Sequence, residues 1–162
     1  MTHPLLKVSN LAKSFGTMTA LRDISFEVAA GEVVCIIGPS GCGKSTLLRC
    51  INYLTFPDGG FVEVDGTHIG REPGRDGKVR MQSHKRIDQL RPTMGFVFQQ
   101  FNLWPHMTVL ENIARGPIKV QRRPREEVER QARALLARFG LAGKEDAYPS
   151  ALSGGQKQRV AI

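Results

Sequence analysis

The stretch Gly38-Pro39-Ser40-Gly41-Cys42-Gly43-Lys44-Ser45 decides how the rest of this sequence is interpreted. It follows Val33-Val34-Cys35-Ile36-Ile37, a continuous apolar run that is typical of a central strand buried on both faces. A helix is predicted to begin near Lys44, directly after the glycine-rich turn. Its inner face would carry Leu47, Leu48 and Ile51.

The chemistry of this turn points to phosphate. The spacing matches G-x-x-x-x-G-K-[ST] in the strand–loop–helix context that the motif requires. Glycines let successive N–H groups point at phosphate oxygens, and the helix N-terminus adds the positive end of its dipole. Lys44 is expected to reach the β- and γ-phosphates and the Ser45 hydroxyl to bind Mg²⁺, with Thr46 in the same nucleotide site. The alternative is a glycine turn with a chance lysine.

Alternating apolar residues predict further strands. Period-two alternation marks two of them, at Leu6 and Val8 and at Ile24, Phe26 and Val28. Asp65-Gly66, after Val62 and Val64, is a strong hairpin signal. Residues 94–98 are predicted to form another buried strand, and residues 70–82 an exposed loop before a short helix near 83–90.

Three helices are predicted in the last third of the chain, two from capping boxes and one from its apolar stripe. Thr108 and Glu111 fit one capping box, and Ser153 and Gln156 fit a second one that opens the final helix. Between them, residues 125–139 are predicted to form an amphipathic helix. Its apolar stripe comprises Val128, Ala132, Leu135, Leu136 and Phe139.

The composition fits a globular domain. Of 162 residues, 41% are hydrophobic and 23% charged, no signal-peptide pattern opens the chain, and no apolar stretch is long enough to cross a bilayer. We therefore expect a cytoplasmic protein that reaches a membrane only through a partner. Cys35, Cys42 and Cys50 are expected to be reduced and mostly buried.

The net charge of +8 is concentrated in two segments. Residues 71–91 hold seven Lys or Arg against three Asp or Glu, and residues 115–138 hold eight against three. No nucleic-acid motif accompanies them, so a solvated face or a face toward anionic lipid is favoured over nucleic-acid binding.

Four elements together resemble the ATP-binding-cassette (ABC) ATPases. Leu152-Ser153-Gly154-Gly155-Gln156 resembles the family's signature, and Gln99, predicted at a strand end, resembles its Q-loop glutamine. Phe15 lies where the family places an aromatic ring that stacks on adenine, and the phosphate loop completes the set. The resemblance implies an α/β P-loop fold with a parallel core sheet, an antiparallel β-subdomain and a helical subdomain. It also implies ATP with Mg²⁺, the metal held by Ser45 and Gln99, and a catalytic role for Gln99.

The signature would act in a dimer. Ser153 and the two glycines are expected to present a bare helix N-terminus that nothing in its own chain fills. The resemblance implies that the γ-phosphate of ATP bound to a second cassette occupies it, with two subunits stacked head to tail. The alternative is an ordinary capped helix.

A finer resemblance concerns the transported solute. Residues 48–52, 99–112 and 156–162 are similar to ATPases of bacterial polar amino acid importers of the glutamine, histidine, arginine or ectoine type. It implies one nucleotide-binding domain over 1–162, with a core over about 1–98, a helical subdomain over about 99–151 and the signature helix from 153. Transmembrane permease subunits would dock on 99–151 at the cytoplasmic face of the inner membrane, with a periplasmic solute-binding protein as an indirect partner.

The family's pattern continues with residues that this sequence does not contain. The catalytic glutamate and the switch histidine follow the signature in the family, so residues 1–162 alone are expected to be an inactive part of a longer ATPase. Two other readings stay open, a soluble cassette ATPase of translation or DNA repair and a nucleotide-binding protein without activity. The short distance between Gln99 and the signature favours the transporter.

Overall fold

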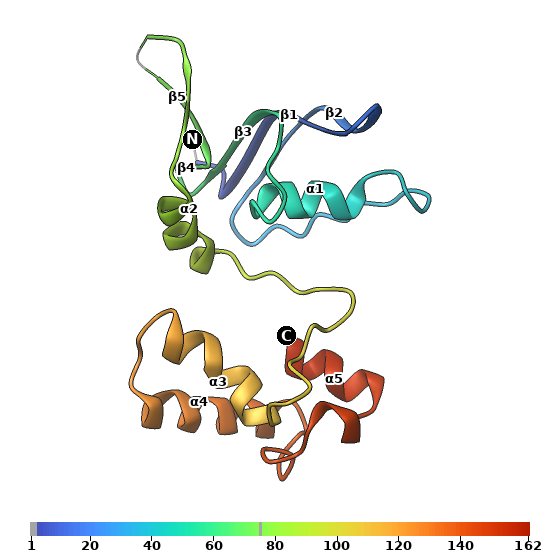
Figure 1. Cartoon of the computed structure of the whole chain (residues 1–162), viewed down its shortest axis with the longest axis vertical. Coiled ribbons are helices and arrows are strands. Elements are labelled where there is room, and N and C mark those ends of the chain that lie inside the picture. The colour runs from blue at the N-terminus through green and yellow to red at the C-terminus, as the bar shows by residue number, and fades with distance from the viewer. Residues whose placement is uncertain (1–2, 75) are drawn as a thin grey trace. The chain divides into compact units, whose positions relative to one another are not determined.

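The structure is a computed structural model that describes residues 3–74 and 76–162. The chain separates into two units, Met1–Phe96 and Val97–Ile162. The first contains the strands and the phosphate loop, and the second is helical (Figure 1).

A four-stranded antiparallel sheet forms the frame of the first unit. Its order is β2 (Met18–Val28), β1 (Leu6–Phe15), β3 (Gly59–Val64) and β4 (Thr67–Ile69). The hairpin between β3 and β4 is confirmed, with φ of 47° at Asp65 and 73° at Gly66, the left-handed pair that a two-residue hairpin turn requires. The period-two strands of the sequence are β1 and β2.

Helix α1 (Lys44–Ile51) follows the phosphate loop and packs on this sheet (Figure 1). Its buried face consists of Leu47, Cys50 and Ile51. The prediction for Leu48 is wrong, because its side chain is 48% exposed. Cys50, with no exposed surface, takes the core position. These side chains share one core with residues of β1, β2 and β3, namely Val8, Leu11, Leu21 and Val62.

Two predicted strands do not form. The run 33–37 is irregular, with Val33 87% and Ile37 92% exposed. A strand buried on both faces depends on hydrogen-bonded neighbours, and within residues 3–74 and 76–162 no strand pairs with this run. Residues 94–98 are likewise irregular rather than extended in a sheet. The sheets of the described residues are antiparallel.

The basic segment 71–91 is more ordered than its sequence indicates. The expected loop contains a hairpin of β5 (Arg71–Pro73) and β6 (Val79–Met81), followed by α2 (His84–Leu90), which Ser83 caps, and a short 3-10 turn, η1 (Arg91–Thr93). The prediction of the helix is confirmed and that of the loop is wrong.

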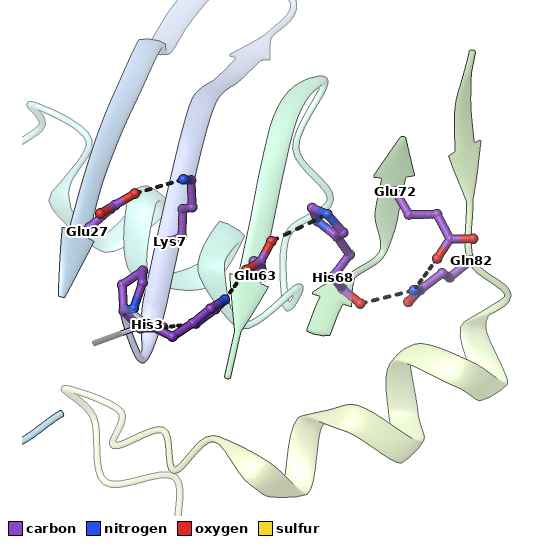
Figure 2. A network of polar contacts seen from close by, with 8 residues as sticks. His3, Lys7, Glu27, Glu63, His68, Glu72 and Gln82 are labelled. Carbon is purple, nitrogen blue, oxygen red and sulfur yellow. Dashed lines mark hydrogen bonds and ion pairs between the residues drawn. The ribbon is translucent and has the colours of Figure 1, made fainter. Parts of the chain in front are cut away.

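Gln82 joins this hairpin to the main sheet. Its amide donates to the His68 carbonyl and to Glu72, both at 3.0 Å, and accepts from the Gly70 N–H at 3.0 Å. Figure 2 shows the contacts of Gln82 with His68 and Glu72. Next to them, Glu63 lies between the rings of His3 and His68, at 3.5 and 3.4 Å. The polar network thus continues across β3 and β4 to Glu72 of β5, at the start of the basic segment 71–91.

The second unit contains α3 (Val109–Lys119), α4 (Arg125–Arg138), a 3-10 turn η2 (Pro149–Ala151) and α5 (Gly154–Ala161). Helices α3 and α4 lie side by side (Figure 1). Their shared core is small, and its buried members are Val109, Leu136, Leu141, Leu152 and Val160. Both predicted capping boxes form, at Thr108 and at Ser153.

The predicted apolar stripe of α4 is only partly buried. Val128, Ala132 and Leu136 lie in the interior, whereas Leu135 is 45% and Phe139 39% exposed. Both exposed residues line a groove that the last residues of α5 border. The helix buries a narrower face than the stripe indicates, because α3 covers only one side of it.

Among the described residues, no helix combines the length and the apolar character needed to cross a membrane.

Candidate functional site

The phosphate loop is built around the beginning of α1. Gly41 and Gly43 have φ of 81° and 93°, in the left-handed region where glycine carries no steric penalty. Gly43 is the N-cap, and no described side chain caps the helix. The first N–H groups of α1 therefore face the loop without a side-chain acceptor, which is the arrangement that binds phosphate oxygens at helix N-termini.

Gly43 also sets how close the loop comes to the sheet. A Cβ atom at this position would lie 2.5 Å from the Ala20 carbonyl oxygen and 3.3 Å from a methyl carbon of Leu21. Real Cβ atoms do not approach backbone oxygen this closely, so glycine is required by space as well as by φ. The end of the loop is thereby fixed against β2.

Lys44 closes the loop through its ammonium group. Its Nζ donates to the carbonyls of Gly38 at 2.7 Å and Pro39 at 2.8 Å and lies 3.6 Å from the Cys42 Sγ. These contacts bring both ends of the motif around one cation. The positive charge, the uncapped helix and the left-handed glycines all favour an anion at this place.

Phe15 ends β1 and belongs to the same unit as the loop. Its side chain is 47% exposed, so the ring is not packed into the sheet. The Lys13 Nζ lies over the ring, 5.3 Å from its centroid. Ala20, which contacts the loop at Gly43, is five residues further along the same hairpin. An exposed ring near the phosphate loop is suited to stacking on a base.

The signature residues begin α5 in the second unit. Ser153 Oγ accepts from the Gln156 N–H at 3.3 Å, and the Gln156 side chain accepts from the Ser153 N–H at 2.9 Å. The expectation of a helix N-terminus that nothing in its own chain fills is therefore wrong in part. The N–H groups of Gly154 and Gly155 lie in the first turn, where a helix supplies no acceptor of its own.

Gln99 is exposed and lies in a turn, not at the end of a strand as its sequence context predicted. The next residues are tightly bent, with φ of 53° at Phe101 and 52° at Asn102. Gln99 and the signature belong to the second unit, whereas the phosphate loop and Phe15 belong to the first. The structure thus assembles one phosphate loop with its aromatic neighbour, and separately one signature turn.

The three cysteines differ in their surroundings. Cys35 and Cys42 are exposed and Cys50 is buried, so the expectation of mostly buried thiols is wrong. Burial raises the pKa of the Cys50 thiol to about 11, which keeps it protonated and unreactive. Cys42, inside the phosphate loop, is open to reagents.

Sequence motifs missed two groups that shape this site. Ala20 defines the approach of Gly43, and Asp58 contacts the segment before Phe15. The turn Pro57-Asp58-Gly59 was the available signal for the second group, but nothing local connects it with β1. Among described residues, no group of three or more His, Cys, Asp or Glu side chains is arranged to hold a metal ion.

Comparison with known families decides the assignment. The family model described as ABC transporter matches residues 21–162, which include the phosphate loop, Gln99 and the signature. The chain belongs to the ABC transporter family.

Curated ABC transporter proteins match almost the whole chain. It is 53% identical over 157 residues to the L-cystine transport system ATP-binding protein TcyN of Escherichia coli (strain K12), covering 97% of this chain and 61% of that protein. It is 46% identical over 162 residues to the arginine transport ATP-binding protein ArgV of Corynebacterium glutamicum, covering 100% and 63%. The chain thus spans about three fifths of the length of these relatives.

Solved ABC cassettes share the fold. A dimeric structure of the ATP-binding cassette MJ0796 in a post-hydrolysis state, bound to ADP and Pi, superposes with a TM-score of 0.79 at 35% identity, covering 96% of this chain and 66% of that one. A second dimeric structure of MJ0796 gives 0.80 at 35% identity, covering 97% and 67%. The α/β fold class of the ABC ATPases is confirmed, with the antiparallel β-subdomain and the helical region formed as expected. The expected parallel core sheet is not formed by the described residues, because the runs 33–37 and 94–98 are irregular.

Proposed function

We propose that the protein binds and hydrolyses ATP as a subunit of an ABC importer of a polar amino acid or a related solute. The phosphate loop carries this proposal, because the Lys44 ammonium donates to the Gly38 and Pro39 carbonyls beside an uncapped helix N-terminus. One nucleotide with its Mg²⁺ fits this donor set, because the loop offers N–H groups, a fixed cation and the Ser45 hydroxyl.

Each residue of the site has a role in this proposal. Lys44 and the loop N–H groups from Gly38 to Thr46 hold the phosphates. Ser45, together with Gln99, ligates the metal that neutralises the phosphate charge. Phe15 stacks on the base. Gln99 orients water at the γ-phosphate, which is a positioning role in hydrolysis.

The signature serves a second copy of the protein. The Gly154 and Gly155 N–H groups, next to the hydroxyl of Ser153 and the amide of Gln156, are proposed to contact the γ-phosphate of ATP on the partner subunit. The dimeric structures of MJ0796 support a pair of cassettes, and we propose that this pair is stacked head to tail. In the capping box the Ser153 Oγ accepts from the Gln156 N–H, so its hydroxyl proton can still be donated to a phosphate oxygen.

Import of polar amino acids is supported by the relatives. Their names refer to transport of L-cystine and of arginine. The protein is proposed to act at the cytoplasmic face of the membrane, bound to transmembrane permease subunits through residues 99–151. A periplasmic solute-binding protein delivers the solute to the permease, and nucleic acid is not a partner.

Co-purification tests this proposal. The tagged protein, isolated from detergent-solubilised membranes of its host, is expected to bring down integral permease subunits. Sealed vesicles of the same membranes, prepared without detergent, are expected to take up a labelled amino acid only with ATP. The Lys44→Ala variant is expected to abolish uptake while still binding the permease. Recovery with ribosomes or DNA instead would contradict the transport assignment.

A further inference from the structure

We propose that Asp58 is a positioning residue for the base of the nucleotide, because it fixes the end of β1 that presents Phe15. Lys13, held by Asp58, covers one face of the ring and leaves the opposite face to the base. This inference rests on the proposed function, because it assumes that a nucleotide binds and that its base stacks on Phe15. The phosphate loop itself is proposed to contact only the phosphates and Mg²⁺.

Asp58 contacts three successive residues before the ring. Its side chain accepts from the Lys13 Nζ at 2.8 Å and from the Ser14 N–H at 2.7 Å. Its own N–H donates to the Ala12 carbonyl at 2.9 Å. One residue of the turn before β3 thus holds the last residues of β1 by side chain and backbone together. Phe15 follows directly, so its backbone position depends on this clamp.

The Asp58 contacts with Ala12, Lys13 and Ser14, called the Asp58 clamp, are better ordered than an ion pair between two fully exposed side chains. Lys13 is only 15% exposed at its side chain although Asp58 is 51% exposed. The Lys13 ammonium and then the Ser14 N–H hold the pKa of the Asp58 carboxyl below its ordinary value, so it is ionised at neutral pH. Lys13 is therefore fixed by a charged partner on one side and contacts the Phe15 ring on the other.

The position of Lys13 gives the ring two unequal faces. A cation over an aromatic face at 5.3 Å is attracted by the ring quadrupole and excludes a stacking base from that face. Phe15 as a whole residue is 47% exposed, and the proposal assigns the opposite face of its ring to the base. Stacking is sensitive to ring placement, so loss of the clamp is expected to weaken binding of the base and to leave the phosphates unaffected.

Comparison of two ligands tests this inference in the intact protein. Binding of Mg-ATP and of inorganic tripolyphosphate with Mg²⁺ is measured by calorimetry for the wild type and for Asp58→Ala, Asp58→Asn and Phe15→Ala. Phe15→Ala is expected to weaken ATP binding about tenfold and Asp58→Ala about threefold to tenfold, with tripolyphosphate affinity unchanged. Asp58→Asn, which keeps an acceptor for Ser14, is expected to fall between Asp58→Ala and the wild type.

The Lys7–Glu27 ion pair provides a matched control. It also joins a β1 lysine to a carboxylate at 2.8 Å, but distant in sequence from Phe15. Glu27→Gln is expected to change neither affinity. The double variant Phe15→Ala/Asp58→Ala is expected to bind ATP no more weakly than Phe15→Ala alone, because both substitutions remove one effect.

Each other outcome overturns the inference. Equal losses for ATP and tripolyphosphate in Asp58→Ala would assign Asp58 a general structural role, and unchanged ATP affinity would show that the ring needs no clamp. Failure of the wild type to bind either ligand would overturn the proposed function and this inference with it. Wild-type binding of tripolyphosphate with additive effects of Phe15 and Asp58 would overturn the inference alone.

Discussion

The phosphate loop and the signature turn are both glycine-rich helix starts, yet their helices begin differently. Helix α1 starts from a left-handed glycine without a side-chain cap, whereas α5 starts from a complete capping box. The first arrangement leaves its N–H groups for an external anion, and the second satisfies part of its own first turn. This difference supports the proposal that the phosphate loop binds nucleotide on its own, while the signature contacts a nucleotide already held by the partner subunit.

Removal of the fixed cation is expected to have the largest effect. Lys44→Ala deletes the ammonium that bonds the Gly38 and Pro39 carbonyls and that is proposed to contact phosphate. A charged hydrogen bond to phosphate contributes about 1.5–3 kcal/mol. Affinity for a fluorescent ATP analogue is expected to fall at least about tenfold, as each 1.4 kcal/mol is a factor of ten. Lys85→Ala, on the exposed side of α2, serves as the control. Unchanged affinity in Lys44→Ala would show that phosphate binds elsewhere.

Glycine substitutions separate the two turns next. Gly43→Ala places a Cβ 2.5 Å from the Ala20 oxygen at a φ of 93°. It is expected to lower the free energy of unfolding by about 1–3 kcal/mol and to weaken ATP binding less than Lys44→Ala does. Gly155→Ala meets no atom within 4 Å and is expected to be neutral or to stabilise by up to about 1 kcal/mol. Urea unfolding and ATP titration measure both. Similar losses of stability and of ATP affinity in Gly43→Ala and Gly155→Ala would contradict the proposed difference between the two helix starts.

The sequence was informative where the chemistry is local. The Asp65-Gly66 turn, the Thr108 and Ser153 capping boxes and the glycine-lysine spacing of the phosphate loop each depend on a few adjacent residues, and each region could be located in advance. The structure adds the distant contacts that complete them, such as Ala20 against Gly43 and Asp58 against Ser14.

Predictions failed where a residue depends on partners far along the chain. The run 33–37 has the composition of a buried strand, but composition does not supply the neighbouring strands that hold one. Leu48 and Cys50 differ by two positions on α1, and only the direction from which the sheet approaches decides which is buried. The β5–β6 hairpin lacked a period-two signal, because its residues are largely exposed.

Serine substitutions are expected to produce smaller and opposite effects at the two helix starts. Ser153→Ala removes the N-cap of α5 and is expected to lower the free energy of unfolding by about 1 kcal/mol, without changing ATP affinity of the monomer. Ser45→Ala removes no cap and is expected to leave stability unchanged. It is expected to weaken ATP binding only when Mg²⁺ is present. Thermal unfolding and titrations with and without Mg²⁺ measure this pair, and loss of stability in Ser45→Ala would contradict the uncapped assignment.

The smallest effect on ATP affinity is expected when the sulfur of Cys42 is replaced by oxygen. Cys42→Ser is expected to keep ATP affinity within about twofold, because two carbonyls hold Lys44 at 2.7 and 2.8 Å and the thiol, at 3.6 Å, adds a weak contact. Alkylation is a different perturbation. A carboxamidomethyl group on the exposed Cys42 places new atoms beside the Lys44 ammonium, so iodoacetamide is expected to block ATP binding, and bound ATP is expected to protect the thiol.

Two other thiols provide the controls for this last measurement. Cys50 is buried with a pKa of about 11 and is expected to remain unmodified in the folded protein. Cys35 is exposed, so the reaction is followed by mass spectrometry in a Cys35→Ser background, with ATP binding measured on the same samples. In the Cys35→Ser/Cys42→Ser protein, iodoacetamide is expected to leave ATP binding intact. Loss of ATP binding in this double variant would show that iodoacetamide acts outside the phosphate loop. Cys42 would then give no evidence that the phosphate loop is open to anions whereas the signature helix is capped.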